Sequence, residues 1–63
     1  MTYAELLEEI RQAAMRIDEG KATRHDLELI SVRIFFNDAG RLAPAIDVPK
    51  AIAAGLLDPG EGL

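Results

Sequence analysis

The first 20 residues carry the hydrophobic pattern of an amphipathic helix. Apolar residues recur three and four positions apart and would share one helix face, while charged residues occupy the other. The apolar positions are Tyr3, Leu6, Leu7, Ile10, Ala13, Ala14 and Ile17. Thr2 is a typical N-cap, Glu5 can complete a capping box with it, and Gly20 is a typical helix end. The pattern predicts a helix over residues 3–19.

The next stretch, TRHDLELISVRIFFNDAG, holds the densest run of large apolar side chains. Thr23 is a typical N-cap and Gly40 a typical helix end, and about four helical turns fit between them, more than a usual strand length. The link before this stretch is short, so the two elements would pack antiparallel. We therefore expect a second helix over residues 24–39.

A β-strand is the alternative for part of the same stretch. β-Branched and aromatic residues are frequent there, and large apolar side chains occur at every second position: Ile30, Val32, Ile34 and Phe36. Such alternation is typical of a strand. A single strand in so short a chain has no obvious partner, which favours the helix but leaves the strand open.

As a helix, residues 24–39 would be apolar on two sides. One stripe, which would pack on the first helix, contains Leu27, Ile30 and Ile34. The second stripe contains Leu29, Val32, Phe35, Phe36 and Ala39. A helix that is apolar on both sides is normally buried on both sides. Because the first helix can cover one stripe only, the second stripe must face either a third helix or another chain.

The last third of the chain shows a shorter helical pattern. Asp47 can cap a helix, and Pro49 is tolerated in its first turn. We predict a third helix over residues 48–57 and a frayed tail over residues 58–63. The expected fold is one all-α domain, an antiparallel helical hairpin plus a short third helix, assembling as a helical bundle.

Composition narrows the ways in which the chain can be stable. At 63 residues it is near the lower limit for a domain that folds alone. Small domains often rely on disulfides, a metal, oligomerisation or efficient helix packing. The chain has no cysteine and one histidine, so a disulfide is excluded and we expect no metal and no cofactor. Efficient helix packing and a partner chain remain as the possible sources of stability.

Charge and hydropathy also indicate location and partner. The N-terminus MTYAELLEEI carries acidic residues where a signal peptide carries basic ones, and the apolar runs are far shorter than the ~20 residues that span a bilayer. The net charge of −4 disfavours duplex DNA and anionic membranes, which attract clustered Lys and Arg. We expect a cytoplasmic protein that does not bind a membrane.

Candidate chemistry is sparse. His25 lies at the start of the second predicted helix, and no hydroxyl residue stands in a nucleophile motif that would use it. Acidic pairs such as Glu8–Glu9 point to different sides of a helix, as on a solvated face, and do not form a calcium loop. We therefore expect no catalytic residue and no enzyme.

Three basic residues form a possible anion-binding cluster: Lys21, Arg24 and His25. They surround the start of the second predicted helix, where free N–H groups attract anions. A small helix-turn-helix-like DNA-binding regulator could use the Lys21–Arg24 region. Asp26 and Glu28 follow directly and would repel phosphate, so DNA binding is the alternative and not the main prediction.

The main prediction is a non-enzymatic protein-interaction module, a small regulator, adaptor or inhibitor of the kind that phages and mobile elements encode. It would act as a homo-oligomer, preferably a dimer, and bind a further protein that the sequence does not identify. Exposed apolar patches on small proteins mark interaction sites, so we assign the interface to the second stripe and the third helix. The predicted interface residues are Leu29, Val32, Phe35, Phe36, Ile52 and Leu56.

Overall fold

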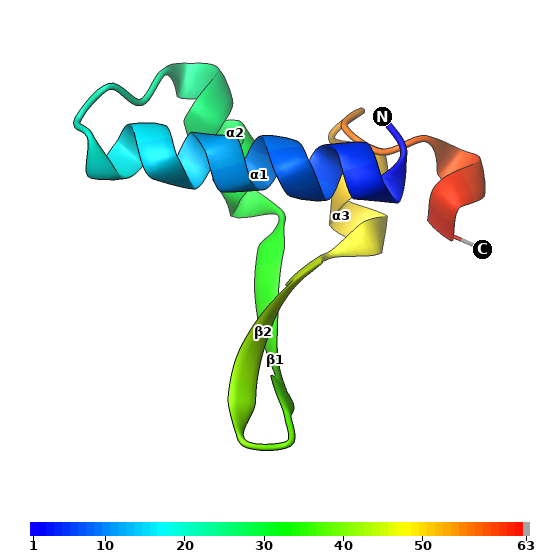
Figure 1. Cartoon of the computed structure of the whole chain (residues 1–63). Helices are drawn as coiled ribbons and strands as arrows, with labels where there is room; N and C mark the ends of the chain where they lie inside the picture. Colours follow the sequence, from blue (N-terminus) through cyan, green and yellow to red (C-terminus); the bar gives the residue numbers. More distant parts are fainter. Residues whose placement is uncertain (63) are drawn as a thin grey trace.

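The computed structural model describes residues 1–62, with side chains for residues 1–60. Two helices, a hairpin and two short helices follow one another in the order α1 (Tyr3–Asp18), α2 (Arg24–Ser31), β1 (Arg33–Asp38), β2 (Arg41–Ile46), α3 (Val48–Ala53) and the 3-10 helix η1 (Pro59–Gly62). β1 and β2 form a two-stranded antiparallel sheet. Figure 1 shows this hairpin projecting away from the three α-helices. The fold is therefore mixed α and β.

The prediction of an all-α helical bundle is wrong, because the second predicted helix, residues 24–39, is divided. α2 ends at Ser31, and the next residues form β1. The strand that β1 needs as a partner is β2, which follows β1 after a loop of only two residues. The alternation of apolar residues between Ile30 and Phe36 is thus partly a strand signal, and the strand alternative was the correct one for residues 33–38.

The prediction for α1 is confirmed. Thr2 caps the helix by accepting a hydrogen bond from the Glu5 backbone N–H at 3.2 Å, and the Glu5 carboxylate accepts from the Thr2 N–H at 3.0 Å. The third predicted helix begins at Val48 as expected but ends at Ala53, because the chain turns at Gly55, which has a positive φ of 75°. A segment without helix then leads to η1. The frayed tail predicted for residues 58–63 lies partly outside the described residues.

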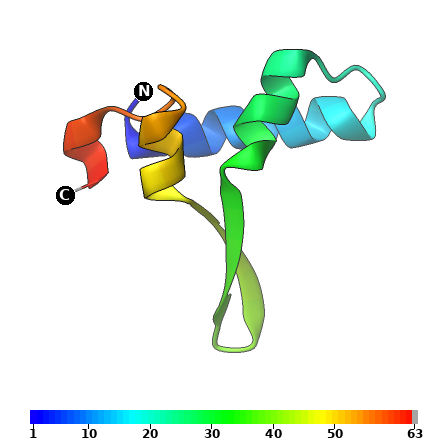
Figure 2. The same ribbon diagram turned by 180° about the vertical axis from the view of Figure 1, so that it is seen from behind.

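One hydrophobic core joins the helices to the base of the hairpin. Its buried members are Leu6, Ile10, Ala13, Leu29, Val32, Ile46, Ala51, Leu56 and Leu57. α2 and α3 both lie on one side of α1, behind it in Figure 1 and in front of it in Figure 2. α1 therefore buries a single face, and most of its charged residues lie outside that face, Arg16 at the contact with α2 being the exception.

Contacts at the first turn of α1 fix the base of the hairpin and the C-terminal segment. The Ile46 N–H, at the end of β2, donates to the Tyr3 hydroxyl at 3.2 Å. The Asp58 N–H donates to the Met1 carbonyl at 3.0 Å, and the N-terminal ammonium lies 3.3 Å from the Asp58 carboxylate. Three segments that are distant in sequence are thus held together at one end of α1.

The hairpin gives the molecule an extended outline. Residues 33–46 are called the hairpin arm below. The described chain measures 35 × 32 × 15 Å along its principal axes, and its radius of gyration is 11.9 Å. A compact domain of this length has a radius of gyration of about 10.6 Å. The excess agrees with an arm that leaves the helical body, as both ribbon views show.

Candidate protein-interaction surface on the hairpin arm

A tight turn builds the tip of the arm. Ala39 and Gly40 have positive φ angles of 52° and 84°, the combination of a type I′ turn, which matches the twist of two antiparallel strands. The Asn37 side chain accepts a hydrogen bond from the Gly40 N–H at 3.0 Å. The sequence predicts that Gly40 ends a helix, where glycine commonly takes a positive φ, and in the structure the same conformation forms the hairpin turn.

The register of the arm determines which backbone groups point outward. Phe35 lies opposite Pro44, Phe36 opposite Ala43, and Ile34 opposite Ala45. Opposed residues in an antiparallel pair alternate between hydrogen-bonded and non-hydrogen-bonded pairs. Pro44 has no N–H, so Phe35 and Pro44 form a non-hydrogen-bonded pair, and the backbone N–H and C=O of Phe35 face away from β2.

The same alternation applies along the whole of β1. Arg33, Phe35 and Asn37 turn their backbone N–H and C=O groups to the outer edge of the sheet. The hydrogen bond from the Asp47 N–H to the Val32 carbonyl, at 2.8 Å, continues this alternation by one residue beyond the strands. Among the described residues, no further strand pairs with this edge. β1 therefore presents an open edge.

The outer edge of β2 is protected at two of its three outward residues, Pro44 and Ile46. Pro44 offers no donor there, and the outward N–H of Ile46 is bonded to the Tyr3 hydroxyl. Proline at an edge is a common device against pairing with another chain. The two edges of the arm are therefore unequal, and β1 is the one equipped to accept another strand.

Large apolar side chains cover both faces of the arm. Since opposed residues share a face, Ile34 and Phe36 lie on one face and Phe35 and Leu42 on the other. Their exposed fractions are 44% for Ile34, 52% for Phe35, 48% for Phe36 and 76% for Leu42. The Arg33 guanidinium lies 4.9 Å from the centre of the Phe35 ring. So much exposed apolar surface on one hairpin is typical of a binding surface.

The predicted interface residues are divided between the core and the arm. Leu29, Val32 and Leu56 are buried within the single chain, so their side chains offer almost no accessible surface, and Ile52 is half-buried against the core. Phe35 and Phe36 are exposed. Sequence reasoning did not assign Ile34 and Leu42 to the interface, although strand alternation places Ile34 beside Phe36.

The two predicted stripes of the second helix do not separate into a buried and an exposed side, although Ile30 of the first stripe does pack against the core. Leu29, assigned to the outward stripe, is fully buried, whereas Leu27, assigned to the contact with α1, is 57% exposed. An ion pair gives a physical reason for this orientation. Asp26 is 2% exposed and accepts two hydrogen bonds from the Arg16 guanidinium of α1, at 2.7 and 2.9 Å. This contact turns the Asp26 side of α2 toward α1.

Asp26 also caps its own helix. Its carboxylate accepts from the Thr23 N–H at 3.0 Å, while the Thr23 hydroxyl accepts from the Asp26 N–H at 3.2 Å. The Arg16 hydrogen bonds, followed by the bond from Thr23, hold the pKa of the Asp26 carboxyl well below its usual range. The same pair raises the pKa of the Arg16 guanidinium. Asp26 is therefore a charged structural residue at the α1–α2 contact.

The possible anion-binding cluster is exposed and gathers around an occupied helix start. Lys21, Arg24 and His25 all face solvent. The Asp26 carboxylate already lies at the N-terminus of α2, where an external anion would have to bind. An N–H group that a bound anion would use is therefore already occupied by a side chain of the chain itself, which weakens the prediction of an anion or DNA site there.

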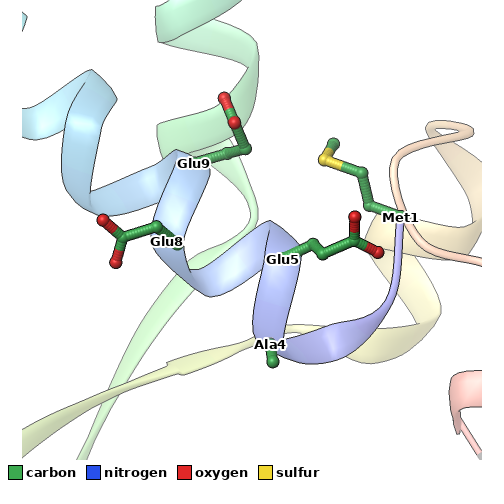
Figure 3. A pocket seen from close by; sticks show the side chains of 5 residues that line it. All are labelled: Met1, Ala4, Glu5, Glu8 and Glu9. Atoms are coloured by element: carbon green, nitrogen blue, oxygen red, sulfur yellow. The ribbon is translucent and has the colours of Figure 1, made fainter.

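A surface hollow of about 500 Å³ lies beside the first turns of α1. It is lined by Met1, Ala4, Glu5, Glu8 and Glu9. Figure 3 shows the three carboxylates pointing in different directions, and Glu5 and Glu8 already bond Thr2 and Arg11. Within the described residues, no group of three or more His, Cys, Asp or Glu side chains could hold a metal. The hollow thus lacks convergent groups for binding or catalysis.

The helices of the described chain do not reach the length and hydrophobicity needed to cross a membrane. No protein-family model, no curated protein and no solved structure matches this chain. Its function must therefore be inferred from the arm itself.

Proposed function

We propose that this chain is a non-enzymatic protein-interaction module whose binding element is the hairpin arm. One observation carries the proposal: a two-stranded hairpin leaves the body with an open strand edge and with Ile34, Phe35, Phe36 and Leu42 exposed. A lone two-stranded hairpin is marginally stable in water, whereas an added strand or a covering surface stabilises it. The binding mode that fits is β-augmentation, in which a strand of the partner extends the sheet.

The observed fold changes the predicted binding surface, whereas the predicted functional class, a protein-interaction module, is kept. The second stripe of a long helix is no longer available as a surface, because α2 ends at Ser31. The exposed phenylalanines assigned to that stripe now belong to β1. The role of small regulator, adaptor or inhibitor stays a prediction, as does a cytoplasmic location.

The test uses a photo-crosslinking residue in place of an exposed apolar one. Benzoylphenylalanine is introduced at Phe36 or, as a matched control, at Met15, which is 54% exposed on the helical body. In cells that express the chain, we expect defined protein adducts from position 36 and none from position 15. Absence of adducts at position 36, or equal adducts at both positions, contradicts an interaction role for the arm.

A further inference from the structure

We infer that the partner of the open β1 edge is β1 of a second copy of this chain, paired antiparallel about a two-fold axis. This inference rests on the proposed function, because it names the partner of the same surface. The assembly would be a continuous four-stranded sheet in the order β2–β1–β1–β2. Four features of the arm support this assembly: the backbone pattern of β1, the side-chain register, the protection of the β2 edge and the charge of the arm.

The backbone of β1 is complementary to itself. Arg33, Phe35 and Asn37 turn their N–H and C=O groups outward at every second position. If Phe35 of one copy lies opposite Phe35 of the other, Arg33 of each copy lies opposite Asn37 of the other. All three outward residues then form hydrogen-bonded pairs. The overlap covers residues 33–37 of both copies, which is nearly the whole of β1.

The side chains also match in this register. Ile34 of each copy lies opposite Phe36 of the other, so two isoleucines and two phenylalanines gather on one face. The two Phe35 rings meet on the opposite face. Aromatic pairs and aromatic–β-branched pairs are the favourable cross-strand combinations. Arg33 lies opposite the uncharged Asn37, so no like charges oppose one another within the overlap.

The protected edge of β2 makes the assembly finite. Pairing through β1 leaves β2 as the outer strand on both sides of the sheet. Pro44 and the Ile46–Tyr3 hydrogen bond block further pairing there. An isologous contact between two identical edges then closes as a dimer and does not grow into a fibre.

Charge favours contact between arms over contact between bodies. The arm contains Arg33, Arg41 and Asp38, a formal charge of +1, and because the whole chain carries −4 the remaining residues carry −5. Two acidic bodies repel each other, whereas two nearly neutral arms do not. The arm also projects from the body, so the contact can form away from the acidic surface.

The expected affinity is modest. A fully buried phenylalanine removes about 150–250 Å² from water, and four half-exposed rings therefore offer on the order of 400 Å². With Ile34 and the strand backbone added, the total buried area stays near or below about 1,200 Å², the low end for specific complexes. We expect a dissociation constant in the roughly micromolar range.

The experiment combines solution mass with two single-cysteine variants, which are unambiguous because the natural chain has no cysteine. Sedimentation equilibrium of the wild type from about 1 µM to about 500 µM brackets a micromolar constant. In the inferred register, Phe35→Cys places two Cα atoms about 5.5 Å apart, within disulfide reach. Leu42→Cys is the control, since three strand spacings, about 14 Å, separate the two β2 strands.

We expect the wild-type mass to approach twice that of one chain, and Phe35→Cys to form a disulfide-linked dimer at least tenfold faster than the more exposed Leu42→Cys. A wild type that stays monomeric throughout overturns the inference. A dimer in which Leu42→Cys crosslinks as fast, or in which neither variant crosslinks, overturns it as well. If photo-crosslinking at Phe36 captures a different protein while these tests fail, the proposed function stands and the second copy is the wrong partner.

Discussion

Phe35 lies directly opposite Pro44 in the hairpin arm, and this pairing turns the backbone of Phe35 outward. Pro44 cannot donate a hydrogen bond, so the ladder between the strands must form at the neighbouring pairs. Pro44 thus has two effects. It protects the β2 edge, and it leaves the β1 edge open at Phe35, at the centre of an apolar surface. The interaction role proposed for this chain follows from that relationship.

Phe36→Asp should weaken self-association while leaving the helical body folded. In the paired sheet its carboxylate would lie opposite Ile34 in an apolar cluster, and burying an unpaired charge costs more than about 1.4 kcal/mol, or roughly tenfold in affinity. The change is measured by sedimentation equilibrium, with circular dichroism as the check on folding. Leu42→Asp, on the outer strand of the same arm, is the control and should have a much smaller effect. Equal effects of the two variants would argue against the β1 edge.

Leu29→Ala should strongly destabilise the chain. Leu29 is fully buried in the core, and truncating such a leucine costs about 2–5 kcal/mol, which is a large part of the stability of a small domain. Leu27→Ala removes the same atoms from an exposed position two residues away on the same helix and should change stability by less than about 0.5 kcal/mol. Urea unfolding compares the two. A larger loss from Leu27→Ala would mean that α2 packs in the opposite orientation.

Folding stability should fall as the pH is lowered from about 5 toward 2. The Asp26 carboxyl has a pKa below its ordinary value of 3.8, chiefly through the Arg16 hydrogen bonds, so its contribution is complete above that value and is lost as pH falls toward the folded-state pKa. Glu5, whose pKa is lowered by its bonds with Thr2, acts in the same direction. The measurement is the urea midpoint as a function of pH.

Asp26→Asn is the control for this pH dependence. It should lower the urea midpoint at neutral pH, because the ion pair with Arg16 is lost, and it should reduce the slope of stability below pH 5, leaving mainly the Glu5 contribution. An unchanged slope would show that Asp26 titrates normally in the folded chain.

Ala39→Asn should stabilise the arm. Ala39 has a φ of 52°, a left-handed conformation that is unfavourable for alanine, whereas Asn-Gly is a preferred pair in a type I′ turn. We expect a gain of about 0.5–1 kcal/mol in the free energy of unfolding. Ala22→Asn, which changes an exposed residue that does not have a positive φ, should be nearly neutral. Destabilisation by Ala39→Asn would contradict the turn geometry.

The sequence predicts the first helix and the start of the third because their signals are local. The Thr2 and Asp47 caps, the apolar period and the terminal glycine all lie within single elements. The division of the second helix is not a local property. Residues 37–40 fit a helix end as well as a hairpin turn, because Gly40 takes a positive φ in either case. Ala39 in place of asparagine or glycine weakens the hairpin signal further.

The second strand was equally hard to predict. Pro44 argues against a central strand, and nothing nearby shows that β2 is an edge strand held at its end by Tyr3, 43 residues away in sequence. Of the predicted interface residues, only some lie on the candidate surface. The surplus of apolar surface at Phe35 and Phe36 is a property of composition and was found, whereas the burial of Leu29 and Val32 depends on how α2 packs.

Residue-resolved amide hydrogen exchange, measured by NMR over a range of protein concentrations, tests most directly whether β1 pairs edge to edge with β1 of a second copy. The outward N–H of Phe35 should exchange more slowly as concentration rises, because pairing covers it. The N–H of Leu42, which points outward on the protected β2 edge, should exchange rapidly at every concentration. If the Phe35 amide exchanges as fast as that of Leu42 and shows no dependence on concentration, the β1 edge is free in solution and β1 does not pair with a second copy.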